Sequence, residues 1–190
     1  MTLAREAGSS FVSEGLQLYC EAGATLRSFH QRVYKICSDI LVEHQREIKA
    51  VLGFSCTDKT LEPDAEPNGP DDDRWDDGEV TLWVQFRPVD ATYFSIGVYW
   101  EQEDSGRRRV NAYAGFDFDA VAARDRLWGL VSGPGAPDMW KYGYGVYVSK
   151  PIEPAEEETF RRLLKEVLQR WLTVLQTVGG VTVLQKAVKK

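Results

Sequence analysis

The spacing of apolar residues changes twice along the chain, and these changes restrict the fold more than any other feature. Over residues 10–52 apolar side chains recur at intervals of three and four, the spacing of one side of an α-helix. Over residues 80–150 the dominant interval is two, which is typical of strands with one buried face. Over residues 154–178 the spacing is helical again. The order helix, strands, helix predicts an α+β fold.

The N-terminal helical region, residues 10–52, is long for a chain of 190 residues. Its apolar stripe predicts one long helix, or two helices joined near Gly23, ending at Gly53. At roughly 1.5 Å per residue the helix would span about 60 Å, so one end is expected to protrude, kink or dimerise. The stripe contains two series with seven-residue spacing, which resemble a short coiled coil and predict a homodimer through this helix. Its members are Tyr19, Ala22, Leu26, Phe29, Val33, Ile36 and Ile40.

Residues 80–150 are the predicted sheet region. Three stretches within it alternate apolar and polar side chains, and the short connections between them predict hairpins and antiparallel pairing. A short helix capped by Asp117 or Asp119 is expected next, followed by a fourth strand from Trp140 to Val148. Residues 181–184 are a candidate edge strand. The predicted sheet is therefore a four- to five-stranded, mainly antiparallel meander.

The C-terminal helix is predicted for residues 154–178. A proline and acidic residues mark its first turn, and a glycine pair follows its last apolar position. Its apolar face is wide, so we expect it to pack on the sheet face that carries Val80, Phe94 and Val110. The whole chain, residues 1–190, is thus predicted to form a single α+β domain. The long N-terminal helix is expected to lie beside or across the C-terminal one.

A concentrated negative charge lies between the N-terminal helix and the predicted sheet. Residues 58–79 carry ten carboxylates against two cations, a charge of −8 in a chain whose net charge is −6. Three prolines and Gly69 argue against regular structure in this segment, so an acidic loop is predicted. Such a field repels nucleic acid and attracts a basic protein surface. We therefore expect a protein with a basic surface as the partner, and no nucleic acid.

The chain lacks the sequence patterns of common catalytic and metal sites. His30 and His44 would lie about 21 Å apart on a continuous helix and cannot share a metal. Cys20, Cys37 and Cys56 are odd in number and lack a C-x-x-C spacing, which favours free thiols over disulfides or a zinc site. The acidic loop does not match the spacing of an EF-hand calcium loop, and no phosphate-binding or nucleophile motif is present. No catalytic residue, metal ligand or cofactor is assigned.

The second face of the predicted sheet is polar and aromatic. Flat rings, amides and guanidinium groups of this kind are enriched at protein interfaces and can also stack on bases or sugars. The alternative is that the N-terminal helix half covers this face and that the aromatic residues serve only in packing. The residues on it are Trp83, Gln85, Arg87, Tyr93, Ser95, Tyr99, Arg109, Asn111 and Tyr113, with Tyr144 as a further candidate.

These features favour a non-enzymatic interaction protein, such as an immunity or inhibitor protein that docks a basic partner. The acidic loop could imitate a phosphate backbone, and the sheet face would supply the remaining contacts. The predicted partner-binding residues are Asp71, Asp72, Asp73, Trp75, Asp76, Asp77, Glu79, Trp83, Arg87, Tyr99, Arg109 and Tyr113.

Two other function classes are consistent with the sequence. One is a small-ligand-binding protein or an enzyme, in which Tyr99, Arg109 and Asn111 would orient an anionic or polar substrate. The other is a structural module that assembles through its N-terminal helix. The first residues lack the apolar segment of a signal peptide, and no run of 18 apolar residues occurs. A cytoplasmic location without membrane contact is therefore expected.

Overall fold

Six antiparallel strands form one sheet in the computed structural model, which describes residues 2–57, 59–63, 80–102, 108–132, 138–153 and 156–189. The strands are β1 (Glu62–Pro63), β2 (Val80–Val89), β3 (Thr92–Gln102), β4 (Arg108–Phe118), β5 (Met139–Tyr142) and β6 (Gly145–Pro151). Their order across the sheet is β1-β2-β3-β4-β6-β5. The helices are α1 (Thr2–Glu43), α2 (Gln45–Leu52), α3 (Val121–Val131), α4 (Glu157–Val178) and α5 (Val181–Val188).

The predicted α+β fold is confirmed, with one strand more than expected. β2, β3 and β4 form the meander, and Asp90 and Ala91 make the turn between the first two. Ala91 adopts a φ of 57°, the left-handed conformation that matches a tight hairpin to the twist of its strands. The acidic segment is not wholly irregular, because Glu62 and Pro63 pair with Gln85 and Val84 at the edge of the sheet.

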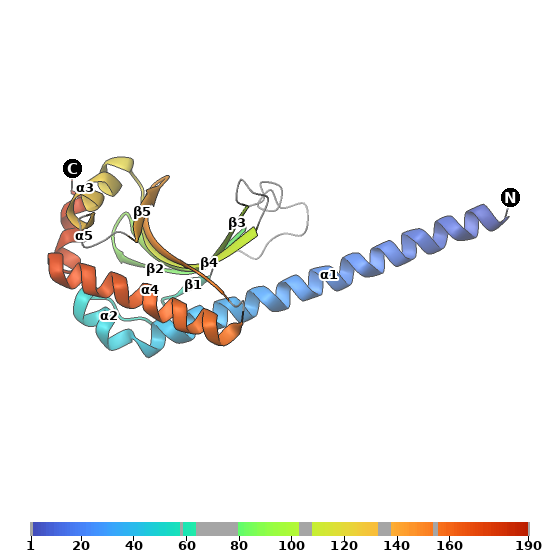
Figure 1. Cartoon of the computed structure of the whole chain (residues 1–190), viewed down its shortest axis with the longest axis horizontal. Coiled ribbons are helices and arrows are strands. Elements are labelled where there is room, and N and C mark those ends of the chain that lie inside the picture. The colour runs from blue at the N-terminus through green and yellow to red at the C-terminus, as the bar shows by residue number, and fades with distance from the viewer. Residues whose placement is uncertain are drawn as a thin grey trace.

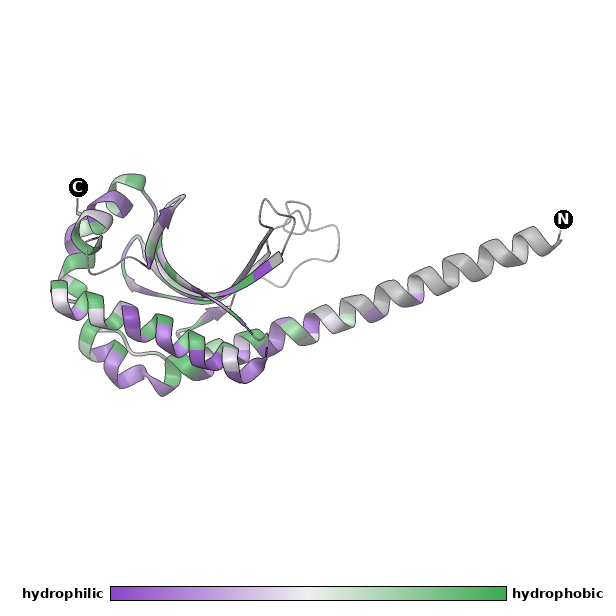
Figure 2. Cartoon of the chain, in the orientation of Figure 1, coloured by the Kyte–Doolittle hydropathy of each residue, from purple (hydrophilic) through white to green (hydrophobic). Residues whose placement is uncertain are grey.

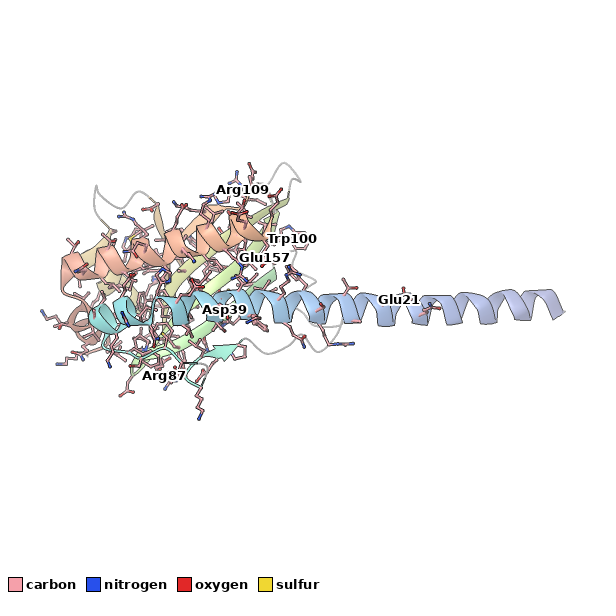
Figure 3. All side chains as sticks on the ribbon, turned by 90° about the horizontal axis from the view of Figure 1, so that it is seen from below. Glu21, Asp39, Arg87, Trp100, Arg109 and Glu157 are labelled. Carbon is pink, nitrogen blue, oxygen red and sulfur yellow. The ribbon has the colours of Figure 1, made fainter. Side chains whose placement is uncertain are left out.

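One face of the sheet is covered by α1 and α4, which lie side by side and run in the same direction (Figures 1 and 3). Ion pairs join them at both ends of their contact, from Arg32 to Glu157 and from Lys165 to Glu43. These side chains are largely exposed, so solvent screens the pairs and each adds little to the stability of the contact. Figure 2 shows hydrophobic and hydrophilic residues in alternating bands along α4, as expected for a helix with one buried face.

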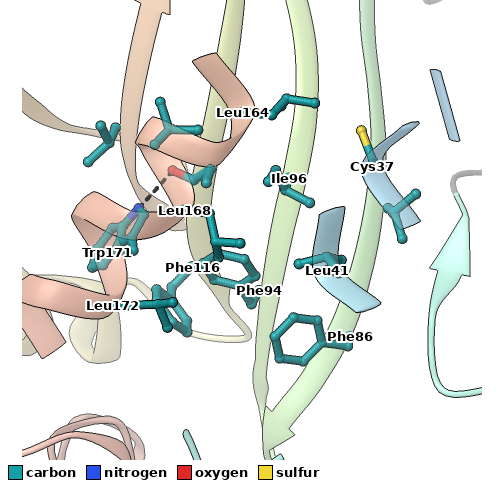
Figure 4. Close-up of a cluster of buried hydrophobic side chains, with 14 of the residues drawn as sticks. Cys37, Leu41, Phe86, Phe94, Ile96, Phe116, Leu164, Leu168, Trp171 and Leu172 are labelled. Carbon is teal, nitrogen blue, oxygen red and sulfur yellow. Dashed lines mark hydrogen bonds between the residues drawn. The ribbon is translucent and has the colours of Figure 1, made fainter. Parts of the chain in front are cut away.

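The core lies between the sheet and these two helices. Phe86, Phe94 and Phe116 come from three neighbouring strands, and their rings contact one another in sequence across the sheet. Trp171 of α4 is fully buried against Phe116, and its indole Nε1 donates a 2.8 Å hydrogen bond to the carbonyl oxygen of Ala114 (Figure 4). This bond satisfies the polar edge of a ring whose burial stabilises the fold by roughly 2–3 kcal/mol.

Helix α1 is longer than its contact with the sheet. Its residues Val33, Ile36 and Ile40 are buried in the core, whereas its N-terminal part extends beyond the sheet (Figure 1). The helix continues through Gly23 and breaks at His44, where the chain turns into α2. Gly53 ends α2 with a φ of 68°, as predicted for a helix-ending glycine. Among the described residues, no helix combines the length and the apolar character needed to cross a lipid bilayer.

Two predicted strands are wrong. The stretch from Trp140 to Val148 is a hairpin of β5 and β6 rather than one strand, because Gly143 adopts a φ of 51° and reverses the chain. Residues 181–184 belong to α5, whose Val183, Leu184 and Ala187 form a buried face. A run of four apolar residues is compatible with a strand or a helix. Here it follows a turn at Gly179 and Gly180 and forms a helix that packs against α3.

Two of the cysteines are buried as free thiols. Cys37 lies in the core, and Cys56 follows α2. Burial raises the pKa of Cys56 to about 12 and the pKa of Cys37 still further. Both thiols are therefore protonated and poor nucleophiles at neutral pH.

Candidate functional site

The face of the sheet opposite α1 and α4 is concave. Figure 1 shows the sheet curving away from these helices, and the hollow that results holds a cavity of about 500 Å³. This volume lies within the range of small-molecule sites in proteins. The cavity is lined by Thr81, Trp83, Gln85, Tyr93, Ser95, Tyr99, Tyr113, Asp117, Trp140, Tyr142 and Tyr147.

Strand register brings these side chains together. Residues that face each other directly on neighbouring strands point to the same side of a sheet. Tyr93 of β3 faces Asp117 of β4, and Trp140 of β5 faces Tyr147 of β6. The cavity is thus built from regular strands rather than from loops, which holds its side chains in fixed positions.

Two glycines make room on the concave face. A Cβ atom at Gly97 would overlap the carbonyl oxygen of Leu82, so the neighbouring strand approaches too closely for any side chain. A Cβ atom at Gly115 would overlap the ring of Tyr147, which lies across that strand. The absence of side chains at these positions lets β2 approach β3 closely at Gly97 and lets the Tyr147 ring lie over Gly115.

Four aromatic rings form a continuous wall. The ring centroids of Trp140 and Tyr147 are 4.8 Å apart, and those of Tyr99 and Tyr113 are 5.8 Å apart. Further contacts join Tyr99 to Trp140 and Tyr113 to Tyr147. Ser149 fixes two of the rings, because its Oγ accepts hydrogen bonds from Trp140 Nε1 at 3.1 Å and from the Tyr99 hydroxyl at 3.3 Å.

Asp117 is the carboxylate of the cavity. Its Oδ1 accepts a hydrogen bond from the Tyr147 hydroxyl, and its Oδ2 accepts one from Ser95 Oγ at 3.1 Å. Burial raises the pKa of Asp117 above its ordinary value, and the two hydrogen bonds only partly oppose this effect. Burial, together with the charge of Asp117, also raises the pKa values of Tyr113 and Tyr147, so both phenols stay neutral at physiological pH.

Only some of the sheet residues predicted from the sequence line the cavity. Trp83, Tyr99 and Tyr113 line the cavity. Arg87 is exposed at its rim, where its guanidinium lies 4.5 Å from the centroid of the Tyr93 ring and donates a hydrogen bond to that hydroxyl.

The remaining predicted residues lie away from the cavity or outside the described part of the chain. Arg109 is exposed near the opposite end of β4, where it faces Glu101, and Figure 3 shows it far from Arg87. Asn111 is buried, and Tyr144 is exposed in the β5–β6 turn. The acidic-loop residues lie outside the described residues: Asp71, Asp72, Asp73, Trp75, Asp76, Asp77 and Glu79.

Helix α1 does not cover this face. It packs against β2 and β3 on the apolar side, where Val33 and Ile36 join Leu82 and Val84 in the core. The alternative in which α1 half covers the polar face is therefore wrong. The rings on the concave face line a cavity that is open to solvent on one side.

Asp117, Trp140 and Tyr147 line the cavity but were not predicted as site residues from the sequence. The alternation that includes Tyr113 continues through β4 to Asp117, whereas the sequence predicts Asp117 or Asp119 as a helix cap. Helix α3 instead follows Ala120, which makes no side-chain cap. Trp140 and Tyr147 would point to opposite faces of a single strand, and only the turn between them places both on the concave face.

Comparison with known proteins assigns neither a family nor a function to the chain. Models of protein families, curated proteins and solved structures were each compared with the chain, and none matched. Within the described ranges, no group of three or more His, Cys, Asp or Glu residues is arranged to hold a metal ion.

Proposed function

We propose that the protein is a binding module whose concave sheet face takes a small organic molecule with a flat ring. The supporting observation is the wall formed by Tyr99, Tyr113, Trp140 and Tyr147 around a recess of about 500 Å³. Aromatic walls bury a flat ligand by stacking, and the few polar groups among them orient it. Asp117, Ser95 and Gln85 are the polar groups placed to do so.

The shape of the site favours a small molecule over a docked protein surface. A stable protein interface covers about 800 Å² on each partner and is broad, whereas this site is a recess on the concave side of one curved sheet. Docking of a basic protein through the acidic loop remains a separate proposal. It predicts that changing Asp71, Asp73, Asp76 and Asp77 to Asn abolishes capture of the partner and leaves binding of uncharged small ligands intact.

A fragment screen with two matched variants tests the ligand-binding proposal. Trp140 lies on the cavity wall, whereas Trp100 faces Val80 and Val110 on the other side of the sheet. We expect ring-containing fragments to bind the wild type and to lose about tenfold in affinity with Trp140→Leu, since stacking on an aromatic side chain contributes roughly 1–3 kcal/mol. Trp100→Leu should leave these affinities unchanged. Equal affinities in wild type and Trp140→Leu, or no binding fragments, would count against the proposal.

We also propose a second function, self-association through α1. Phe29 is 53% exposed on α1, one turn before Val33, which is buried in the core. It borders an apolar groove of about 440 Å³ that includes Val98, Val110, Ile152 and Phe160. An exposed ring beside an apolar groove, on a helix that continues past its own domain, suits a second copy of the same helix.

A further inference from the structure

The described residues that line the cavity carry a single formal charge, and it is negative. Among the described residues that line it, Asp117 is the one charged side chain, and none is Lys, Arg or His. The cationic side chains near the cavity contact other groups outside it. Arg87 lies on Tyr93 at the rim, and Arg124 and Lys141 both pair with Asp125 on the outer side of the β5–β6 hairpin. The described lining residues therefore include no cationic side chain that could neutralise a bound anion.

Asp117 retains capacity to bind a donor. A carboxylate has about four lone-pair positions, and the described residues supply one hydrogen bond to each oxygen, from Tyr147 and from Ser95. Both donors are neutral hydroxyls, so they orient the carboxylate without cancelling its charge. A ligand cation would supply the positive charge that neither of these two donors gives to the half-buried carboxylate.

The rings beside Asp117 suit the same kind of ligand. Tyr147 donates to the carboxylate, and the rings of Trp140 and Tyr113 lie next to that of Tyr147. The face of an aromatic ring is electronegative and attracts an ammonium group within about 6 Å of its centroid. A cation at Asp117 would thus lie beside the carboxylate and close to these aromatic rings.

We propose, on the basis of the ligand-binding function above, that the ligand is a cationic amine, with its ammonium group at Asp117 and its ring against the aromatic wall. The ammonium class includes protonated and methylated amines, because the ring faces accept both. An anionic substrate, which the sequence suggested for Tyr99, Arg109 and Asn111, is disfavoured. Arg109 is not among the residues that line the cavity, and the one charge inside is negative.

Three probes with the same ring and different charges test this assignment: phenethylamine, phenethyl alcohol and phenylacetate. Calorimetry at neutral pH should show that the amine binds about tenfold more tightly than the alcohol, since a hydrogen bond to a charged group contributes roughly 1.5–3 kcal/mol. Phenylacetate should bind most weakly. With Asp117→Asn the amine and the alcohol should bind equally. Asp119→Asn, an exposed carboxylate two residues further along the chain, should keep the preference for the amine.

The outcomes separate this inference from the proposed function. Binding of the alcohol reports that Asp117→Asn is folded, and the amine-to-alcohol ratio of the wild type needs no variant. Equal affinities for amine and alcohol in the wild type, both lowered by Trp140→Leu, would overturn the cationic assignment and support the ligand-binding proposal. Absence of binding by all three probes would overturn the assignment. If fragments of other chemistry also fail to bind, the proposed function fails with it.

Discussion

At the residue scale, Asp117 is a carboxylate whose surroundings differ from those of a surface group. Its two hydrogen-bond donors lower its pKa, but burial in the aromatic cavity has the larger effect and raises it. The folded state therefore holds this proton up to a higher pH than the unfolded chain does. Between the ordinary carboxyl pKa and the raised one, the folded state therefore binds more protons than the unfolded chain. The free energy of unfolding consequently decreases as the pH rises through this range.

Asp117→Asn should reveal this penalty as a pH-dependent difference in stability. The free energy of unfolding of the variant minus that of the wild type should increase as the pH rises through this window and then stay constant. Glu157 and Glu166 have lowered pKa values, because cationic side chains bind them, so they add stability as the pH rises. Their effect is the same in both proteins and cancels in the difference.

Urea denaturation across the acid and neutral range measures the difference, with Asp119→Asn as the control for removal of one charge. Tyr113 and Tyr147, the other titratable groups beside Asp117, remain neutral in this range. A difference that does not vary with pH would show that the pKa of Asp117 is not raised in the folded protein.

At the element scale, the concave face requires close approach of β2 and β3 at Gly97. A methyl group there would overlap the backbone of Leu82, which cannot move without breaking the strand pairing. Gly97→Ala should therefore destabilise the fold by about 1–3 kcal/mol, the usual range for overpacking.

Gly129 provides the opposite control. It lies in α3, and a Cβ atom there would meet no other atom within 4 Å. Gly129→Ala should stabilise the fold by about 0.5–1 kcal/mol, because alanine loses less conformational freedom in a helix. Thermal unfolding of both variants checks the pair. A neutral Gly97→Ala would mean that β2 and β3 lie further apart than described.

Strand faces were predictable where the signal is local. The alternation of apolar and polar residues in β2, β3 and β4 follows from the period of a strand, so it could be obtained without knowledge of the neighbours. The β5–β6 hairpin was not predictable in the same way, since Gly143 is compatible with a strand or a turn. Helix α5 was missed for a related reason: its short apolar run is ambiguous, and packing decides its structure.

The candidate site was likewise predictable only where the sequence signal is local. Trp83, Tyr99 and Tyr113 were singled out from the alternation, and they line the cavity. Its charge was not predicted, because Asp117 lies at the end of a strand, where cap and strand positions have the same sequence signal. The curvature of the sheet, which turns a polar face into a recess, depends on strand contacts that a single sequence does not display.

At the scale of the whole molecule, the two long helices α1 and α4 lie on one face of the sheet and leave the concave face uncovered by either of them, while α1 extends past the domain (Figure 1). Self-association through α1 predicts a dimer in light scattering at micromolar concentration. Phe29→Glu should give a monomer, because it places a charge beside the apolar groove. Gln31→Glu, an exposed position on the same helix, should remain dimeric. A monomeric wild type would contradict this second function.

The central claim is that the concave face binds a small ligand, and an NMR titration with phenethylamine tests it most directly. The indole N–H signals of Trp83 and Trp140 report on the cavity, whereas that of Trp171 reports on the buried core behind the sheet. We predict saturable shifts for Trp83, Trp140 and the amides of Gly97 and Gly115, with Trp171 unchanged. Shifts confined to α1 or to other surfaces, or no saturable shift at the cavity, would contradict the account.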